Sequence, residues 1–355
     1  MLGASEGEGK VLVLDFGGSS TKFGLVGNEG TICARGRLAA PRASEEDFLG
    51  VVRDALEAAG QPVRGIAISL GGNLDRRTGV VVSSGQFLYL RGQSVMDVVH
   101  KVFDGPVTVV HDGYAAGLAE MRLGSLRGVD YGLVLVLGTG IGSAIVLGGQ
   151  IYEGAHFCAG EYSLVRVDGT RSLDSVWARR GGGVGLTDFV REFCGIDEPG
   201  FDGPEVFRRA EAGDKDVRAA LEAFCENFAV QAYNAQAVLD VDRIAIGGGV
   251  SAQPLLLELV RKHLHAIFEA ERDLHLTVQE PELVACAFRN DAQHPGCLAG
   301  LLRASVGAQE GRGRRMRSLG AADDRGPSRL EGGARGERLP PARALSRRGL
   351  SPCHA

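Results

Sequence analysis

Residues 11–27 read VLVLDFGGSSTKFGLVG, and they set the architecture expected of the whole chain. An apolar run ends at the pair Gly17-Gly18, and a second apolar run follows at once through Phe23 and Leu25. Two short apolar runs joined by a glycine turn are typical of a β-hairpin. The same order of parts returns at residues 131–154, YGLVLVLGTGIGSAIVLGGQIYEG. The sequence therefore predicts two similar halves.

Working outward from the first hairpin, strand and helix patterns alternate. A helix is expected from about Ser44 to Ala59, with Ser44 and Asp47 spaced as in a capping box. Strands are expected at residues 63–72, which end in a glycine loop, and within residues 107–113, where the strand ends at the pair His111-Asp112. This alternation predicts a mixed α/β fold.

The second half continues in the same way. An amphipathic helix is expected at 216–239, and a strand, a triple-glycine turn and a helix at 242–264. We expect a smaller N-terminal domain at 1–120 and a larger domain at 121–290. A final helix at about 291–306 is expected to pack back on the smaller domain.

Composition excludes several classes of protein. The 355 residues carry a formal net charge of -5, with 44% hydrophobic and 23% charged residues, so nothing points to nucleic acid or to a membrane as a partner. No run is apolar enough to span a bilayer, and the N-terminus lacks the apolar core of a secretory signal, so a cytoplasmic protein is expected. The seven cysteines are scattered without a CxxC pair, which predicts neither a disulfide framework nor a zinc knuckle.

The last part of the chain, 309–355, has a different character. It is rich in Arg, Gly and Pro, contains no Lys, and has almost no apolar periodicity on which a core could form. An Arg-rich tail could contact RNA or an acidic partner. The pattern favours a disordered extension that activity does not require.

Three glycine turns suggest phosphate binding. Consecutive backbone N–H groups without Cβ atoms form a concavity that binds anions. The turns contain Gly17-Gly18, Gly138 to Gly142, and Gly247 to Gly249. The first two join strand to strand, so they are neither a Walker A loop nor a dinucleotide-binding GxGxxG turn. A single glycine turn is weak evidence for phosphate binding. The order in which the three turns follow one another along the chain is stronger evidence.

These turns and their neighbours resemble the ROK family of sugar kinases and related repressors, within the actin-like ATPase fold. The resemblance covers roughly residues 10–305 and rests on the motifs DFGGSSTKFGLV, SLGGNLDRRTG, VVHDGYAAGLAE, VLGTGIGSAIV, YEGAHFCAGE and IAIGGGVS. It implies two actin-like ATPase (ribonuclease H-like) domains, with mixed sheets flanked by helices and a cleft between the domains. A homodimer is also implied as possible.

The resemblance implies ATP and Mg2+ as cofactors. Asp112 corresponds to the catalytic aspartate, a general base that accepts the proton of the attacking hydroxyl. Asp15 is expected to hold Mg2+, through water because Mg2+ dehydrates reluctantly. Lys22 is expected either to contact phosphate or to be merely solvated. The full set of implied nucleotide contacts is Asp15, Gly17, Gly18, Ser19, Thr21, Lys22, Gly138, Thr139, Gly140, Gly142, Gly247, Gly248 and Gly249.

The implied sugar contacts are Gly72, Asn73, His111, Asp112 and Glu161. Glu161 corresponds to a family glutamate that binds sugar hydroxyls, although it could instead cap a turn. Gly71 stands where the family usually has proline, which makes this loop more flexible.

Two departures from the family pattern matter. Leu164 stands where zinc-binding members have histidine, and no cysteine lies between Cys158 and Cys194, so no zinc site is expected. The segments SSGQFLYLRG and SLDSVWARRGGGVGLTDFV resemble the zinc-less subgroup that includes β-glucoside kinases. The second departure is His111, which replaces the family asparagine and can reshape the sugar pocket.

The residues next to His111 argue against two other roles. Metal ligation lacks a convincing third ligand, and a hydrolase relay lacks a serine on a nucleophile elbow. The role of His111 is therefore expected to differ from that of Asp112.

The expected function is ATP-dependent phosphorylation of a hexose or hexose derivative, of the glucose, N-acetylhexosamine or β-glucoside type, at the 6-hydroxyl. The alternative is a non-catalytic sugar-binding regulator. Family repressors carry a helix-turn-helix ahead of the first motif, and only about ten residues precede it here, so DNA binding is not expected.

Overall fold

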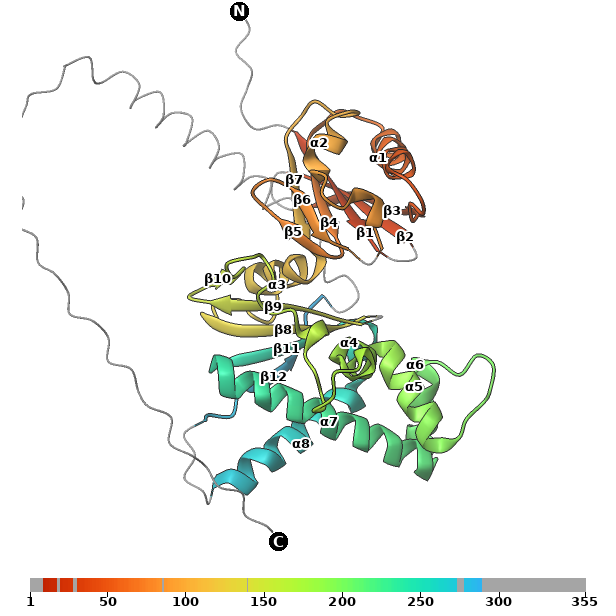
Figure 1. Ribbon diagram of the computed structural model, residues 1–355, viewed down its shortest axis with the longest axis vertical. Helices are drawn as coiled ribbons and strands as arrows, with labels where there is room; N and C mark the ends of the chain where they lie inside the picture. The colour runs from red at the N-terminus through yellow and green to blue at the C-terminus, as the bar shows by residue number, and fades with distance from the viewer. Residues whose placement is uncertain are drawn as a thin grey trace, which may run out of the picture. The chain divides into compact units, whose positions relative to one another are not determined.

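The computed structural model describes residues 9–17, 20–27, 31–84, 86–138, 140–272 and 278–288. Two five-stranded sheets organise this part of the chain, and a two-stranded sheet accompanies the first (Figure 1). Both large sheets belong to one compact unit, Met1–Gln309, and Glu310–Ala355 form a second unit. The expected helix at 291–306 and the tail at 309–355 lie outside the described residues, and the boundary near residue 120 stays a prediction.

The first sheet has the strand order β3-β2-β1-β4-β7. Its strands are β1 (Lys10–Phe16), β2 (Ser20–Val26), β3 (Ile32–Ala39), β4 (Val63–Leu70) and β7 (Val107–His111). β1 and β2 pair antiparallel, which confirms the first hairpin. β4 and β7 join in parallel, so that Phe16 lies beside Leu70 and Leu70 beside His111. The carboxyl ends of β1, β4 and β7 therefore meet at one edge of the sheet.

Four short elements lie in the chain between β4 and β7. They are β5 (Asn73–Asp75) and β6 (Val80–Ser83), which form the two-stranded sheet, the 3-10 turn η1 (Leu88–Leu90), and α2 (Val95–Val99).

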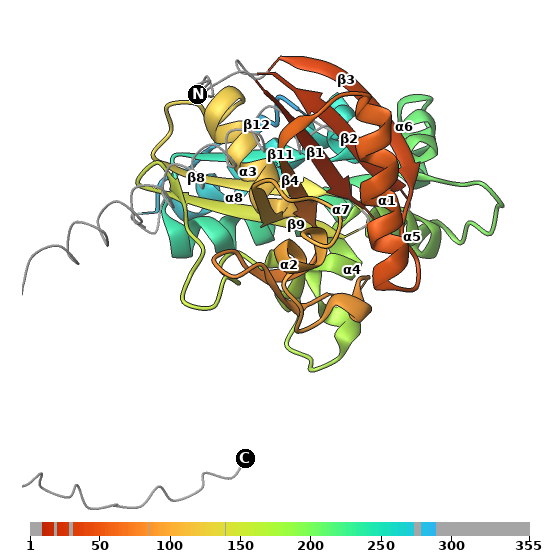
Figure 2. The same ribbon diagram turned by 90° about the horizontal axis from the view of Figure 1, so that it is seen from above.

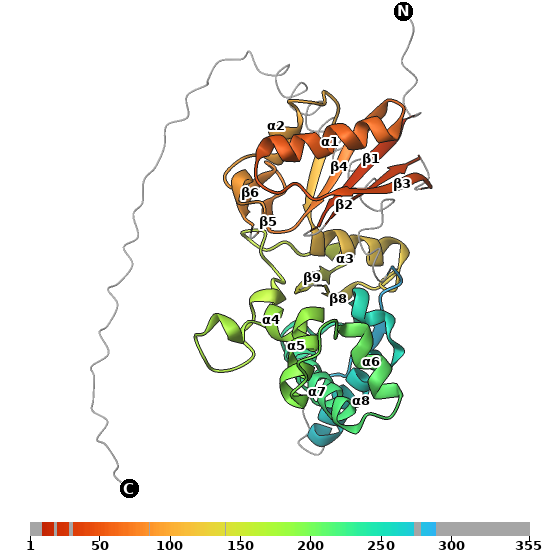
Figure 3. The same ribbon diagram turned by 90° about the vertical axis from the view of Figure 1, so that its right-hand side faces the viewer.

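Helix α1 (Glu45–Ala59) covers one face of the first sheet (Figures 2 and 3). Ser44 Oγ accepts a hydrogen bond from the Asp47 backbone N–H at 3.1 Å, as the spacing predicts. The Asp47 carboxylate accepts one from the Ala43 N–H at 3.0 Å, which completes the cap. Phe48, Val52 and Ala55 recur at helical spacing and are buried in the core against the sheet.

The second sheet repeats the plan with the order β10-β9-β8-β11-β12. Its strands are β8 (Tyr131–Leu137), β9 (Ile141–Leu147), β10 (Gln150–Ile151), β11 (Arg243–Gly247) and β12 (Glu282–Ala285). β8 and β9 form the second hairpin that the sequence predicts. β11 runs parallel to β8 and places Gly247 beside Val136, so the glycine turns after β8 and β11 meet at one edge.

Helix α3 (Asp112–Leu123) lies between the two sheets and contacts β7 and β4 on one side and β8 and β9 on the other (Figures 1 and 3). Small residues allow this approach. A Cβ at Gly113 would lie 2.5 Å from the Ser143 carbonyl oxygen, and one at Gly117 would lie 2.4 Å from the Ala144 Cβ. Glycine is therefore required at both positions for the helix to reach β9.

The remaining helices cover the other face of the second sheet (Figure 1). They are α4 (Trp177–Gly181), α5 (Gly183–Cys194), α6 (Gly203–Glu211), α7 (Lys215–Leu239) and α8 (Pro254–Arg272), with the 3-10 turns η2 (Tyr162–Leu164), η3 (Leu173–Ser175) and η4 (Gly249–Ala252). Helix α7 confirms the amphipathic helix expected at 216–239. None of the helices in the described ranges is long and apolar enough to cross a membrane.

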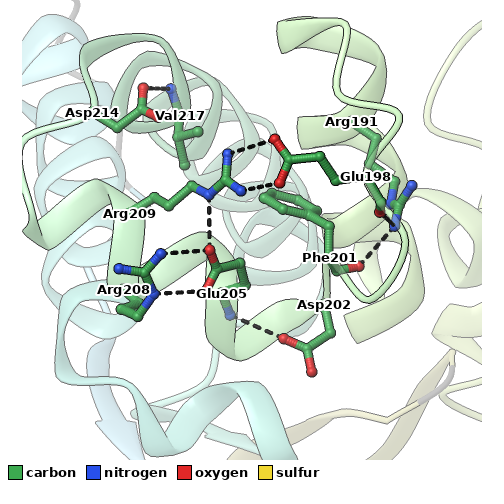
Figure 4. Close-up of polar contacts among 9 residues, drawn as sticks. All are labelled: Arg191, Glu198, Phe201, Asp202, Glu205, Arg208, Arg209, Asp214 and Val217. Atoms are coloured by element: carbon green, nitrogen blue, oxygen red, sulfur yellow. Dashed lines mark hydrogen bonds and ion pairs between the residues drawn. The ribbon is translucent and has the colours of Figure 1, made fainter.

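The connection between α5 and α6 is held by arginines (Figure 4). Arg209 pairs with Glu198 and, at 2.8 Å, with Glu205. Phe201 is buried between two guanidinium groups, with the Arg191 and Arg209 carbons 5.5 and 5.2 Å from the ring centroid. These cation–π contacts and ion pairs fix the end of α5 relative to α6, away from the edge where the glycine turns meet.

Candidate active site

The pairing of β1, β4 and β7 brings three motifs to one sheet edge. Asp15 lies near the end of β1, Gly71 and Gly72 follow β4, and Asp112 follows β7 as the first residue of α3. Ligands of open α/β sheets bind outside the carboxyl ends of the strands. A ligand-binding site is therefore expected at this edge.

A cavity of about 470 Å³ opens at this edge, within the usual range for small-molecule sites. It is bounded on one side by the loop after β4 and the start of α3, and on the other by the β8–β9 turn and the segment before η2. Seven residues expected from the sequence line it: Gly72, His111, Asp112, Gly138, Gly140, Gly142 and Glu161. Residues expected to contact the sugar and residues expected to contact the phosphates thus line the same cavity.

Other expected residues do not line this cavity. They are Asp15, Gly17, Thr21, Lys22, Asn73, Gly247, Gly248 and Gly249. Asn73 is the first residue of β5 and pairs with Ser83. Gly18, Ser19 and Thr139 lie outside the described residues.

The two oxygens of Asp112 have different surroundings. Oδ1 accepts a hydrogen bond from the Gly113 backbone N–H at 2.7 Å and lies 3.1 Å from His111 Nε2. Oδ2 faces the loop after β4, because a Cβ built on Gly71 would lie 3.5 Å from it. The side chain of Asp112 is 41% exposed and lines the cavity.

His111 contacts a second carboxylate as well. Its Nε2 lies 3.7 Å from Glu161 Oε1, and its side chain is only 12% exposed. Glu161 Oε2 accepts a hydrogen bond from Ser163 Oγ at 3.1 Å. Glu161 also precedes η2, but its side chain makes no capping hydrogen bond there. Sequence reasoning separated His111 from Asp112, whereas the structure places the imidazole between two carboxylates.

The segment that carries Glu161 is anchored from three directions. Tyr114 Oη donates to the Ala159 carbonyl at 3.0 Å from α3, and Ser143 Oγ of β9 donates to the Gly160 carbonyl. Arg76, in the turn between β5 and β6, pairs with Glu153 at 2.5 Å. Helix α3, strand β9 and the turn between β5 and β6 therefore all contribute to the position of Glu161.

Asp15 sits in an unusual electrostatic environment. Burial raises the pKa of its carboxyl from 3.8 to about 6; the charge of Lys22 opposes this rise, the charge of Asp112 adds to it, and the Ser69 hydroxyl opposes it. A cation near Asp15 would favour its ionised form. Nearby on β2, the buried Thr21 Oγ1 has no hydrogen-bond partner among the described residues. A half-buried carboxylate beside a lysine and an unpaired hydroxyl fit a site for a hydrated Mg2+ and a phosphate.

The glycines of the second half fall into two groups. A Cβ on Gly248 would lie 2.1 Å from the Leu137 carbonyl oxygen, and its φ of 91° favours glycine in any case. A Cβ on Gly138 would meet no described atom within 4 Å, although Gly138 lines the cavity. Packing therefore requires glycine at 248 but not at 138. The Gly138 carbonyl also accepts a hydrogen bond from Gly183 N–H at 2.8 Å, which sets the start of α5 beside this turn.

Sequence reasoning missed Gln86. This residue lines the cavity, and its Nε2 donates to the Gly17 carbonyl at 3.0 Å. It ties the first glycine turn to the loop before η1. Gln86 lies in the segment SSGQFLYLRG, a pattern that by itself indicates only the zinc-less subgroup.

A sequence profile of the ROK family matches residues 11–299 of this chain. The chain belongs to the ROK family. A β-glucoside kinase from Klebsiella pneumoniae is 28% identical over 258 residues, which cover 72% of this chain and 86% of that protein. The resemblance that the motifs carry is thereby confirmed.

Solved ROK structures agree with the fold. A ROK family protein from Streptococcus pneumoniae, solved in complex with sucrose, is 25% identical, with a TM-score of 0.73 over 84% of this chain and 99% of that one. A ROK family glucokinase from Streptomyces griseus, solved with glucose and AMPPNP, is 22% identical, with a TM-score of 0.70 over 82% and 98%. These likenesses confirm the actin-like ATPase fold with two mixed sheets flanked by helices.

The described ranges were expected to hold no zinc site, and this stays a prediction. No group of three or more His, Cys, Asp or Glu side chains there is arranged to hold a metal ion. Leu164, at the position where zinc-binding ROK members have histidine, is 61% exposed.

Proposed function

We propose that this ROK protein is an ATP-dependent sugar kinase that phosphorylates a hexose or hexose derivative at its 6-hydroxyl. One observation carries the proposal: Asp112 lines a single cavity together with the sugar-side residues Gly72 and Glu161 and the phosphate-side glycines Gly138 and Gly140. A carboxylate at that junction can meet a sugar hydroxyl and the γ-phosphate together. The names of the relatives, which include β-glucoside and N-acetyl-D-glucosamine kinases, support the same chemistry.

In the proposed reaction the sugar lies in the cavity against Gly72, His111 and Glu161. Asn73, which follows Gly72 in the chain, is the remaining proposed sugar contact. Asp112 acts as general base and takes the proton of the hydroxyl that attacks the γ-phosphate. The sugar oxygen forms a bond to phosphorus as the bond between the γ-phosphorus and the bridging oxygen breaks, and ADP leaves. Catalysis otherwise depends on position and on charge stabilisation around the phosphoryl group.

The phosphates are proposed to lie between the two hairpin turns. Mg2+, when bound, neutralises phosphate charge, and Asp15 would hold it through water. The start of α5 beside Gly138 adds a helix N-terminus, which favours anions. The other proposed nucleotide contacts are Gly17, Gly18, Ser19, Thr21, Lys22, Gly138, Thr139, Gly140, Gly142, Gly247, Gly248 and Gly249.

The alternative is a sugar-binding regulator without kinase activity. It is favoured by His111, which stands where the family has asparagine and lies against both carboxylates of the site. Sugar binding and catalysis can be measured separately, so the two functions can be told apart.

The test is a coupled assay of ADP release with glucose, N-acetylhexosamines and β-glucosides. We expect at least one sugar to stimulate ADP formation, and Asp112→Asn to lower kcat by about 10²- to 10⁴-fold with little change in the KM for ATP. Asp54→Asn, on the exposed face of α1, is the control and should retain full activity. Sugars that raise the melting temperature without stimulating ADP release would favour the regulator. Full activity of Asp112→Asn would refute the proposed mechanism.

A further inference from the structure

We propose that His111 is a positioning residue whose Nε2 holds Oδ1 of Asp112 and so leaves Oδ2 as the oxygen that accepts the sugar proton. The inference rests on the proposed function, because only phosphoryl transfer to a hydroxyl needs this base. It goes further by dividing the two oxygens of Asp112 between separate tasks.

The contacts of Oδ1 occupy it. It receives the Gly113 N–H at 2.7 Å and lies 3.1 Å from His111 Nε2. Of the two carboxylate oxygens, only Oδ2 faces the loop of Gly71 and Gly72, which borders the cavity. A hydroxyl bound in that cavity therefore meets Oδ2.

His111 is itself held in place. It is the last residue of β7, paired with Leu70, and its ring meets Tyr114 edge to face at a centroid distance of 5.4 Å and an angle of 76°. A Cβ on Gly113 would lie 3.1 Å from Cε1 of the imidazole, so the backbone of α3 also limits the ring. A ring confined by strand, aromatic side chain and helix can fix the carboxylate beside it.

The groups that face the imidazole come from two elements. Asp112 and Tyr114 belong to α3, and Glu161 precedes η2. When Nε2 carries hydrogen, it donates to Oδ1 of Asp112 and attracts Glu161 Oε1 at 3.7 Å. One side chain thus sets both the base and the carboxylate proposed to bind sugar hydroxyls.

In the step that follows, the proton of the sugar hydroxyl moves to Oδ2 as the sugar oxygen bonds to the γ-phosphorus. The bridging oxygen leaves with ADP and keeps the electron pair of the broken bond. His111 exchanges no proton with the substrate. Its effect is on the orientation of Asp112, and therefore on kcat more than on ATP binding.

Three substitutions at this position separate the possible roles. Glutamine places an amide N–H about where Nε2 lies, asparagine carries the same amide but is one bond too short, and phenylalanine keeps a ring without a donor. If His111 positions Asp112, His111→Gln retains kcat within about threefold. His111→Asn and His111→Phe then lose kcat, and a misplacement near 1 Å lowers it by roughly 100-fold.

Other roles of His111 predict a different ranking of the three variants in kcat or KM. A packing role makes His111→Phe the most active variant, and a simple sugar contact raises the KM for sugar in His111→Phe while kcat is unchanged. Either result would overturn the proposal, as would equal kcat in His111→Gln and His111→Asn. Melting temperatures are measured with the kinetics, so that if one variant does not fold, the comparison of His111→Gln with the remaining variant still decides.

Asp112→Asn, measured alongside, keeps this inference distinct from the proposed function. An inactive Asp112→Asn with equal activity in all three His111 variants overturns the positioning role alone. A fully active Asp112→Asn overturns the base assignment, and this inference with it.

Discussion

Gly138 is conspicuous because nothing among the described residues requires glycine there. It has no left-handed φ, and an added Cβ would meet no described atom within 4 Å, yet it lines the cavity beside the β8–β9 turn. A methyl group at this position would occupy space that the proposed phosphate needs. The residue is better explained by a ligand than by folding.

We therefore expect Gly138→Ala to weaken ATP binding without loss of stability. The free energy of unfolding should fall by less than about 1 kcal/mol, because alanine at a compatible backbone angle is tolerated. The KM for ATP should rise at least tenfold, which corresponds to about 1.4 kcal/mol of binding free energy. Urea denaturation and steady-state kinetics measure the two effects.

Gly248→Ala is the matched control for Gly138→Ala. Its Cβ would lie 2.1 Å from the Leu137 carbonyl oxygen, and its φ of 91° strains any residue with a side chain. This variant should be destabilised by clearly more than 1 kcal/mol. Equal stability of the two variants, or an unchanged KM in Gly138→Ala, would remove the argument that Gly138 serves a ligand.

Asp15 gives a prediction about pH, because burial holds its folded pKa at about 6 against 3.8 in the unfolded chain. Below pH 3.8 the carboxyl is neutral in both states and costs nothing. As pH rises from 3.8 to 6, the unfolded chain ionises first, so stability falls, and it levels off above pH 6. The loss is about 3 kcal/mol at 1.36 kcal/mol per pKa unit.

Asp15→Asn should therefore be more stable than the wild type at pH 8 in the absence of nucleotide, by up to about 3 kcal/mol, and no more stable near pH 3.5. Denaturation at several pH values measures the difference, with Asp54→Asn on the exposed face of α1 as control. Mg2+ and ATP together should raise the melting temperature of the wild type and not of Asp15→Asn. A less stable Asp15→Asn at pH 8 would show that the ionised carboxylate stabilises the fold.

At the scale of elements, sequence patterns predicted the features that interactions between neighbouring residues determine. Ser44 and Asp47 predicted the start of α1, and the glycine pair at Gly17 predicted the first hairpin, because caps and turns depend on neighbouring residues. The end of β7 at His111 followed from the apolar run before it. In each case the interacting groups are a few residues apart.

Contacts between distant segments could not be read in this way. His111 and Glu161 are 50 positions apart, and the Gln86 side chain reaches Gly17 across 69. Their approach depends on the pairing of strands and on how closely α3 lies against β9, which no local pattern contains. The direct contact of His111 with Asp112 also depends on the orientation of the imidazole, which packs against Tyr114 and lies near Glu161.

Helix α3 links the site to the end of the described chain. Its residue Glu120 is fully buried and accepts hydrogen bonds from Ser125 N and Oγ, both at 2.8 Å. It also accepts the backbone N–H groups of Ala287 and Phe288, at 3.0 and 3.1 Å. A buried carboxylate with four donors is well satisfied. The helix that carries Asp112 at one end is thus fixed at its other end by the segment after β12.

At the scale of the whole molecule, the tail should not contribute to activity. The family profile ends at residue 299, the second unit begins at Glu310, and every residue lining the cavity precedes residue 179. A chain that ends at Gly307 should therefore keep its kcat/KM for sugar and for ATP within about twofold, because the lost segment has almost no apolar pattern with which to build a core. Steady-state kinetics and thermal melting compare the shortened and full-length proteins.

A second truncation, after Ala285, shows that these measurements can detect a necessary C-terminus. It removes the buried Cys286 and takes from Glu120 the N–H donors of Ala287 and Phe288. A buried carboxylate that loses two hydrogen bonds costs several kcal/mol, so this chain should melt well below the full-length protein and lose activity. A clear fall in kcat/KM for the chain ending at Gly307, with an unchanged melting temperature, would instead assign the tail a direct part in catalysis.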